Sequence, residues 1–214
     1  MKVFLNFGHI LVLILIIILA IISLYQTDAL SNIFDSKSEA ALLKSDIDYD
    51  KDGVDDYTDI LNGALEFVAK KPKYKSAYYN GGYPTDGNYV CTDVFWYALK
   101  SAGYDFKTLI DTDIKENKDS YDADTGDTNI DFRRVRNIKV YLDRYMTKLD
   151  TDDISTYNPG DIVVYDNHIA IVGDTKNKKG ENYIIHHDGI HKYNDNGLFR
   201  KKVIGHYRWQ YKNV

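Results

Sequence analysis

The sequence predicts an α+β fold, in which helices come first and an antiparallel sheet follows. Two observations lead to this class. Apolar residues recur at helical spacing between positions 59 and 146, and short β-branched or aromatic runs take over from position 161. The chain has 214 residues, of which 44% are hydrophobic and 28% are charged. Such a chain can form one domain with a sizeable core and additional segments.

Composition excludes several classes of protein and site. The single cysteine, Cys91, excludes intramolecular disulfides and any zinc site built on several thiolates. The net charge of −5 argues against a nucleic-acid-binding protein, because such proteins are usually basic. We therefore expect no nucleic-acid partner, and we expect the chain to be a monomer.

Residues 1–27 are predicted to be a transmembrane anchor or a signal segment. Residues 3–27 contain no charged side chain, and residues 10–24 read ILVLILIIILAIISL. A helix needs about 20 apolar residues to cross a membrane, and residues 4–25 are long enough. Lys2 precedes the apolar run and an acidic segment follows it, so the positive-inside rule places the remainder outside the cytoplasm.

A cleaved signal peptide is the alternative interpretation of this segment, although no clear Ala-x-Ala cleavage site follows the apolar run. Both interpretations export the rest of the chain. The expected location is the cell membrane, with the folded domain outside the cytoplasm, or the exterior if the segment is removed.

The exported part begins with an acidic segment. Ten acidic residues and three lysines lie between Asp28 and Asp59. Residues 28–47 are predicted to be a polar tether. Residues 48–59 match an EF-hand calcium loop, with carboxylates at loop positions 1, 3, 5 and 12 and glycine at position 6.

The sequence therefore predicts a structural Ca²⁺ site in residues 48–59. An acidic linker without an ion is the alternative, and Asp55 stands at a position that is usually aliphatic. The predicted ligands are the side chains of Asp48, Asp50, Asp52 and Asp59 and the backbone carbonyl of Val54.

Hydrophobic spacing and turn residues give the expected elements. Helices are predicted over residues 59–71, which Pro72 ends, from Cys91 to a stop at Gly103, and from about Asp131 to Met146. Strands are predicted within residues 162–165, 168–174, 183–187 and 203–211.

Cys91 lies where a loop is predicted to turn into a helix. A helix N-terminus favours the thiolate and lowers the pKa of a thiol from about 8.5, and the thiolate is the nucleophile. A buried, unreactive cysteine is the alternative.

Two histidines lie on neighbouring predicted strands. His168 opens one strand and His186 closes the next, and a hairpin would place the two rings side by side. We expect both to face the helix that begins at Cys91. A thiol nucleophile needs an imidazole base and a third polar group that orients the base. With six histidines in the chain, some would lie on strands by chance.

The order of several motifs resembles the NlpC/P60 cysteine peptidase superfamily. Within it, the sequence is similar to the DUF1287 proteins over residues 55–211. The superfamily motifs are YYNGG (78–82), CTD (91–93), PGDIVV (159–164), HIAIV (168–172) and IIH (184–186). The DUF1287-like motifs are GYP (82–84), DTNIDFRRVRN (127–137) and IGHYR (204–208).

The resemblance implies a papain-like fold and a hydrolase domain over residues 60–214. By position, Cys91 would be the nucleophile, His168 the general base and His186 the third polar residue, with neighbouring His187 as the other candidate for that role. Tyr78 would line the active site.

The function that this resemblance implies is an extracytoplasmic cysteine hydrolase without a catalytic cofactor. Its expected substrate is an amide bond in a cell-wall peptidoglycan peptide, and its other expected partner is the membrane, through the N-terminal helix. A catalytically silent cell-envelope binding module and a thiol acyltransferase are the alternatives.

Overall fold

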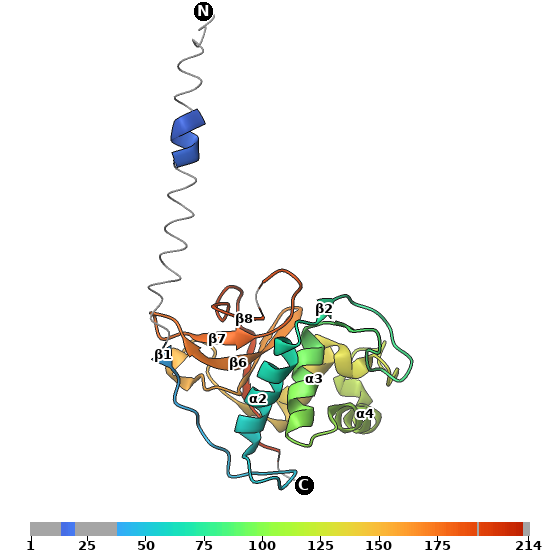
Figure 1. Cartoon of the computed structure of the whole chain (residues 1–214). Helices are drawn as coiled ribbons and strands as arrows, with labels where there is room; N and C mark the ends of the chain where they lie inside the picture. Colours follow the sequence, from blue (N-terminus) through green and yellow to red (C-terminus); the bar gives the residue numbers. More distant parts are fainter. Residues whose placement is uncertain (1–13, 20–37, 192, 212–214) are drawn as a thin grey trace, which may run out of the picture. The chain divides into compact units, whose positions relative to one another are not determined.

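The computed structural model describes residues 14–19, 38–191 and 193–211 (Figure 1). The chain divides into an N-terminal unit up to Lys37 and a compact unit from Ser38 onward. In the N-terminal unit, residues 14–19 are helical and their apolar side chains are exposed. None of the described helices is long and apolar enough to span a membrane. Most of the predicted anchor, residues 1–27, lies outside the described residues.

The compact unit packs helices on one face of an antiparallel sheet, which confirms the α+β class (Figure 1). The helices are α2 (Asp56–Ala69), α3 (Cys91–Ser101), α4 (Phe106–Glu116) and α5 (Val135–Tyr145), with short 3₁₀ turns η1 (Lys118–Ser120), η2 (Asp131–Arg133) and η3 (Ile154–Thr156).

The described residues form one seven-stranded sheet in the order β4-β9-β5-β6-β7-β8, with β1 also paired to β6. Its strands are β1 (Ser38–Glu39), β4 (Thr147–Lys148), β5 (Ile162–Tyr165), β6 (His168–Lys176), β7 (Asn182–Ile185), β8 (Asn194–Asp195) and β9 (Gly205–Arg208). A separate parallel pair consists of β2 (Lys73–Tyr74) and β3 (Asn88–Tyr89).

The predicted helices are present with shifted ends. Helix α2 begins three residues before the predicted start because Asp55 caps it, accepting hydrogen bonds from the backbone and the hydroxyl of Thr58. The chain leaves α3 through Gly103 at φ +80°, a conformation that suits glycine. The third predicted helix is divided at Arg134 into η2 and α5.

Helix α4 was not among the predicted elements. Its buried apolar residues, Phe106, Ile110 and Ile114, are one turn apart, and Asp105 caps it by accepting the Thr108 N–H. The apolar spacing and the capping aspartate are both present in the sequence. The charged and polar residues between them weaken the apolar stripe, so the helix was not predicted.

The four predicted strand runs correspond to β5, β6, β7 and β9, although β6 extends two residues beyond its run and β7 begins one residue before its run. Strands β6 and β7 form the predicted antiparallel hairpin, with Ile171 opposite Ile185. Residues 38–39 of the predicted tether form β1 and pair with residues 175–176 of β6, so this end of the tether belongs to the sheet. Residues 28–37 lie outside the described residues.

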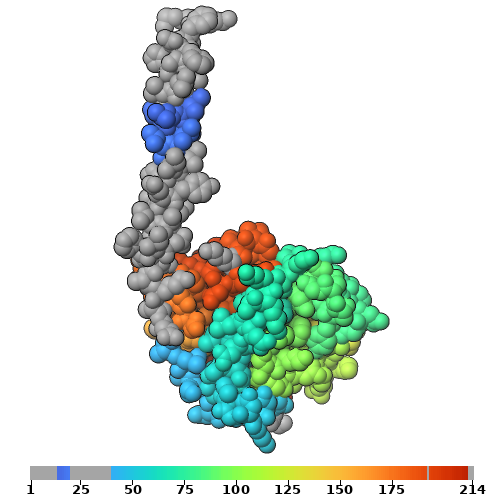
Figure 2. All heavy atoms as spheres, in the orientation of Figure 1, coloured from blue at the N-terminus to red at the C-terminus, as the bar shows by residue number. Residues whose placement is uncertain are grey.

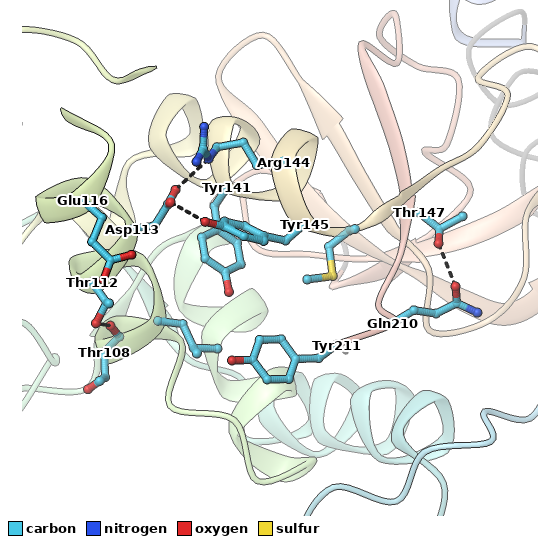
Figure 3. A pocket seen from close by; sticks show the side chains of 12 residues that line it. Thr108, Thr112, Asp113, Glu116, Tyr141, Arg144, Tyr145, Thr147, Gln210 and Tyr211 are labelled. Carbon is cyan, nitrogen blue, oxygen red and sulfur yellow. Dashed lines mark hydrogen bonds and ion pairs between the residues drawn. The ribbon is translucent and has the colours of Figure 1, made fainter. Parts of the chain in front are cut away.

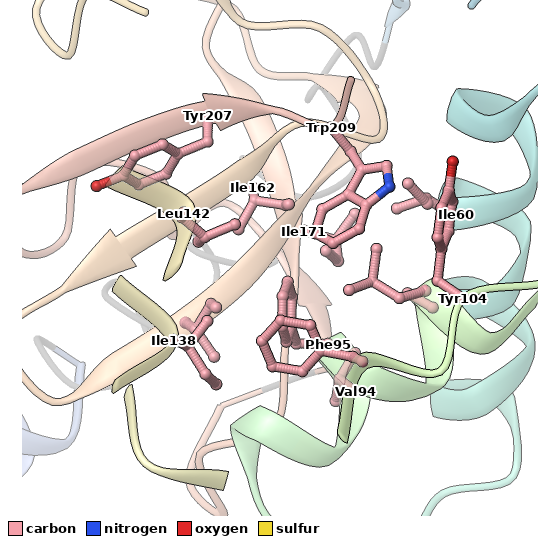
Figure 4. Packing of buried hydrophobic residues seen from close by; sticks show 14 of the residues in the cluster. Ile60, Val94, Phe95, Tyr104, Ile138, Leu142, Ile162, Ile171, Tyr207 and Trp209 are labelled. Atoms are coloured by element: carbon pink, nitrogen blue, oxygen red, sulfur yellow. The ribbon is translucent and has the colours of Figure 1, made fainter. Parts of the chain in front are cut away.

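Alternation along the strands produces two buried faces. The face covered by the helices carries the main core, whose packing with Phe95 and Trp209 is shown in Figure 4. Its sheet residues are Ile162, Val164, Ile169, Ile171 and Ile185. The opposite face forms a second cluster from Val163, Tyr165, Ala170, Val172 and Ile184 together with Tyr157, Leu198 and Val203.

Helices α2 and α3 approach closely at Gly63. A Cβ atom at Gly63 would lie 2.3 Å from Ser101 Oγ and 3.2 Å from Ala98 Cα. The second contact is with backbone, which cannot rotate away as a side chain can. The separation of the two helices therefore depends on glycine at this position.

We expect Gly63→Ala to lower the free energy of unfolding by about 1–2 kcal/mol, because overpacking costs more than the gain in helix propensity. The measurement is urea-induced unfolding followed by circular dichroism. Asn62→Ala, at an exposed position of the same helix, is the control and should be neutral or slightly stabilising. A more stable Gly63→Ala variant would show that the two helices are not in close contact.

Candidate active site

Cys91 is the first residue of α3, and its thiol is half-buried. The preceding cap residue, Val90, has no acceptor in its side chain. Burial raises the pKa of the Cys91 thiol to about 11, although the backbone amides of Ile169 and Thr92 act in the opposite direction. The expectation of a thiol with a lowered pKa is therefore wrong. The helix N-terminus is present, but desolvation outweighs it, and the thiol is protonated at neutral pH.

His168 and His186 are hydrogen-bonded to each other. His168 Nε2 lies 2.8 Å from His186 Nδ1, and the two ring planes are nearly perpendicular. Burial and the neighbouring His186 lower the pKa of His168 to about 4, so this ring is neutral at neutral pH. His187 points elsewhere and packs its ring against Tyr74 and Tyr193.

Strand alternation bears on the expectation that both imidazoles face α3, which stays a prediction. Helix α3 packs on the sheet face that carries Ile169 and Ile171, whereas alternation places His168 with Ala170 on the other face. The spacing of the strands predicted which histidines would pair. It could not show which face of the sheet the helices cover.

The thiol meets the sheet at the start of β6. Register pairs between β6 and β7 begin at Ile171 and Ile185, so residues 168–170 have no register partner on β7. Here the backbone amide of Ile169 contacts the Cys91 thiol. The structure thus brings the predicted nucleophile to the residue adjoining His168.

Asp195 extends the pair of histidines into a chain of polar groups. Its Oδ1 lies 3.3 Å from His186 Nε2, and its other oxygen accepts a hydrogen bond of 2.7 Å from Arg200. Burial acts to raise the pKa of Asp195, but these interactions with His186 and Arg200 outweigh it and lower the pKa. The sequence analysis missed Asp195 because β8 has only two residues and shows no periodicity.

The start of α3 is fixed by a buried ion pair. The Asp93 carboxylate accepts two hydrogen bonds of 2.9 Å from the Arg133 guanidinium, and their side chains are 0% and 2% exposed. The same carboxylate accepts the Val90 N–H and the Trp96 indole N–H. Arg133 also donates to the carbonyl of Ala77. This pair therefore joins the nucleophile's helix to the loop before β3.

The tyrosine that interacts with Cys91 is Tyr74. Burial raises the pKa of Tyr74, and negative charge on Cys91 and on Asp188 would raise it further. The predicted Tyr78 is exposed, and its hydroxyl bonds with Asp127 and Asn129. Its role in the active site stays a prediction.

A polar cavity of about 440 Å³ adjoins these groups. It includes Tyr74, which interacts with Cys91, and His191, whose ring stacks near that of His186. Its lining residues are Lys71, Pro72, Lys73, Tyr74, His187, Gly189, His191 and Tyr193.

Another cavity, of about 510 Å³, lies between α4 and α5 (Figure 3). Several of its polar groups are already paired, since Asp113 bonds with Arg144 and Tyr145, and Thr147 bonds with Gln210. Its lining residues include neither cysteine nor histidine. The cavity beside Tyr74 is therefore the better candidate for a reactive site.

The predicted calcium ligands are also partly brought together. Asp48, Asp50 and Asp52 can each place one carboxylate oxygen within 4.8 Å of the others. Asp59 is buried at the start of α2, and burial and the charges of Asp52 and Asp50 raise its pKa to about 6.

Comparisons with known proteins assign the family. The family model described as "Domain of unknown function (DUF1287)" matches residues 61–209. The chain belongs to the DUF1287 family. It is also 32% identical over 164 residues to the uncharacterized protein YijF of Escherichia coli (strain K12), a match that covers 70% of this chain and 80% of YijF. No solved structure matches the chain. The predicted resemblance to DUF1287 proteins is thus confirmed.

We expect Arg133→Met to lower the free energy of unfolding by about 3 kcal/mol, because it leaves the Asp93 carboxylate buried without its partner. Arg136→Met is the control, since Arg136 is 49% exposed and pairs with Asp124 at the surface. That change should cost less than about 1 kcal/mol. The measurement is urea unfolding, and equal losses for the two variants would contradict the importance of the buried pair.

We expect His168 to make the protein less stable in acid. Its pKa of about 4 in the fold is below the unfolded value of 6.5, so this stabilising effect is complete above pH 6.5 and is lost as the pH falls toward 4. Between these limits the wild-type protein should lose up to about 3 kcal/mol more than His168→Gln does.

Unfolding free energies measured from neutral pH down to about pH 4 test this expectation. His191→Gln, a change at a more exposed histidine, is the control and should follow the wild-type profile. Parallel profiles for wild type and His168→Gln would show that His168 titrates normally in the folded protein.

Proposed function

We propose that this chain is an extracytoplasmic cysteine hydrolase with an NlpC/P60-type, papain-like fold that cleaves amide bonds in cell-wall peptides. One observation supports it above all. The thiol of Cys91 contacts the amide of Ile169, next to His168, and His168 is hydrogen-bonded to His186, whose Nε2 lies 3.3 Å from the Asp195 carboxylate. A nucleophile, a base and orienting groups are the parts that thiol-based amide cleavage requires.

The geometry assigns each ring nitrogen in the proposed mechanism. His168 Nε2 is engaged with His186, so Nδ1 is the nitrogen that takes the thiol proton. The neutral His168 must then carry its proton on Nε2 and donate it to His186 Nδ1. His186 in turn carries its proton on Nε2, toward Asp195. One set of tautomers thus satisfies the whole chain.

The thiol and the imidazole are both neutral at rest, so proton transfer accompanies attack. As the Cys91 sulfur bonds to the amide carbonyl, its proton passes to His168 Nδ1, and Asp195 stabilises the resulting imidazolium through His186. The backbone amides of Cys91 and Thr92 at the start of α3 contact the thiol and would stabilise the developing oxyanion. His168 then gives the proton to the leaving amine, and water hydrolyses the thioester.

The proposed substrate class follows from the cavity and the family resemblance. Lys71 and Lys73 line the cavity beside Tyr74, together with His187 and His191. Cationic side chains suit a peptide that carries free carboxylates. The apolar residues 4–25 support a location outside the cytoplasm, on the membrane or beyond it.

A catalytically silent cell-envelope binding module is the second candidate. The observation that favours it is the raised pKa of Cys91, since a thiol that stays protonated is a poor nucleophile. The two candidates differ in whether His168 can remove the proton when a substrate is bound.

We expect the protein, without its N-terminal segment, to release new amino groups from purified peptidoglycan peptides. Cys91→Ala and His168→Gln should each reduce the rate by at least about 100-fold, because both belong to the proton-transfer and attack steps. Asp195→Asn should reduce it less, and Asn62→Ala, at an exposed position of α2 outside the cavity lining, should leave it within a few-fold of wild type.

Alkylation of Cys91 by iodoacetamide gives a second readout. The alkylation rate should keep rising well above pH 9 in the absence of substrate, because the Cys91 thiol, with a pKa of about 11, ionises only at high pH. Cell-wall binding without product release, equal in wild type and Cys91→Ala, would establish the binding module instead. Products in which the acyl group has moved to an added amine would indicate an acyltransferase.

A further inference from the structure

The acidic loop before α2 gathers carboxylates around a tight turn. Asp48 accepts hydrogen bonds from the backbone amides of Asp52 and Gly53, and Asp52 accepts one from the amide of Val54. Gly53 has φ +95°, as the sharp turn at this position requires. Asp48, Asp50 and Asp52 can converge within 4.8 Å, although each carries a negative charge.

An independent observation comes from Asp59, on the first turn of α2. Its residue is only 8% exposed, and its buried Oδ2 has no hydrogen-bond partner among the described residues. The nearest charges that act on this carboxylate are those of the loop, Asp52 and Asp50 first. A buried carboxylate oxygen without a donor is costly, and the negative charges of Asp52, Asp50 and Asp48 also act on it. A bound cation would offset these charges.

We infer that residues 48–59 form a binding site for one Ca²⁺ ion, with Asp59 as its buried ligand. Calcium accepts six to eight oxygen ligands in flexible geometry, and the carboxylates with one backbone carbonyl supply most of them, leaving room for water. The ligands are the side chains of Asp48, Asp50, Asp52 and Asp59 and the carbonyl of Val54.

The remaining acidic residues of the loop have other partners. Asp55 caps α2 and accepts hydrogen bonds from Ser45 and Thr58, which explains an acidic residue where calcium loops usually carry an aliphatic one. Both oxygens of Asp56 are also engaged, one with the Tyr49 amide and one with the Tyr104 hydroxyl. These two carboxylates are therefore structural and are not counted as ligands.

The ion would fasten the loop to the core rather than act on the thiol. Tyr49, within the loop, stacks on Tyr104 at 4.2 Å, and Gly103 lies directly against Asp50. Gly103 follows the C-terminal end of α3, whereas Cys91 is at its N-terminal end, about 16 Å away along the helix. In Figure 2 the loop segment (light blue) lies at the opposite end of the compact unit from the β2 region.

Calorimetric titration with CaCl₂ and thermal melts of the protein without its N-terminal segment test the site. Extracellular calcium modules bind with Kd of about 10⁻⁴–10⁻³ M, so about 10 mM calcium should raise the Tm by at least about 3 °C relative to chelator. Magnesium at the same concentration should raise it less, because the ion demands stricter octahedral geometry.

Two variants separate a metal site from an acidic surface. Asp59→Asn should raise the Tm in chelator, since it removes a buried charge, and should abolish the shift with calcium. Asp46→Asn makes the same charge change at an exposed position of the same segment and should keep the full shift.

Equal melting temperatures with calcium and with chelator in the wild-type protein would overturn the inference, as would an undiminished shift in Asp59→Asn. The calcium shift should persist in Cys91→Ala. A calcium shift in a protein without hydrolase activity would therefore support the metal site and count only against the proposed function.

Discussion

The buried ion pair between Asp93 and Arg133 is the interaction on which the candidate active site depends. Four donors, three from side chains and one from the backbone, converge on the Asp93 carboxylate. Arg133 reaches from the 3₁₀ turn before α5 and also contacts the loop before β3 through Ala77. A buried pair repays its desolvation only when its hydrogen bonds are satisfied, as they are here. The Asp93–Arg133 pair thus positions the Cys91 thiol by fixing the start of α3.

Strand β6 separates two environments that meet at its first residues. The thiol packs against the helix-covered core, while Ala170 and Ile184, which strand alternation aligns with His168 and His186, belong to the smaller cluster around Leu198. The main core therefore fixes the proposed nucleophile, and the smaller cluster supports the strands that carry the proposed acid–base groups. The proposed substrate would meet both near the start of β6, in the cavity beside Tyr74 and His191.

Local patterns in the sequence were sufficient for most of the fold. Periods of 3.6 and 2 residues predicted α2, α3, α5 and the four main strands, and the period of 2 also selected His186 over His187 as the neighbour of His168. Helix α4 carries a cap and an apolar stripe, but the acidic and polar residues between them obscured the pattern.

The properties of the site that could not be predicted are those set by distant parts of the chain. The pKa of Cys91 depends on burial beneath several elements, which outweighs the local effect of the helix terminus. Asp195 reaches His186 only because a two-residue strand pairs with β7. Tyr74, rather than Tyr78, interacts with Cys91 because of the path of the loop between α2 and α3.

Strand β1 makes the cooperative folding unit larger than the region that defines the family. The family match covers residues 61–209, whereas β1 pairs with the end of β6, and Asp55 and Asp56 fix the first turn of α2. A chain trimmed to the matched region would lose a sheet strand, a helix cap and the partner of the buried Tyr104 hydroxyl. It would also lose Tyr211, whose ring packs against that of Tyr104. Recombinant forms that start before Ser38 and extend through Tyr211 retain all of these contacts and are the natural boundaries for biochemical work.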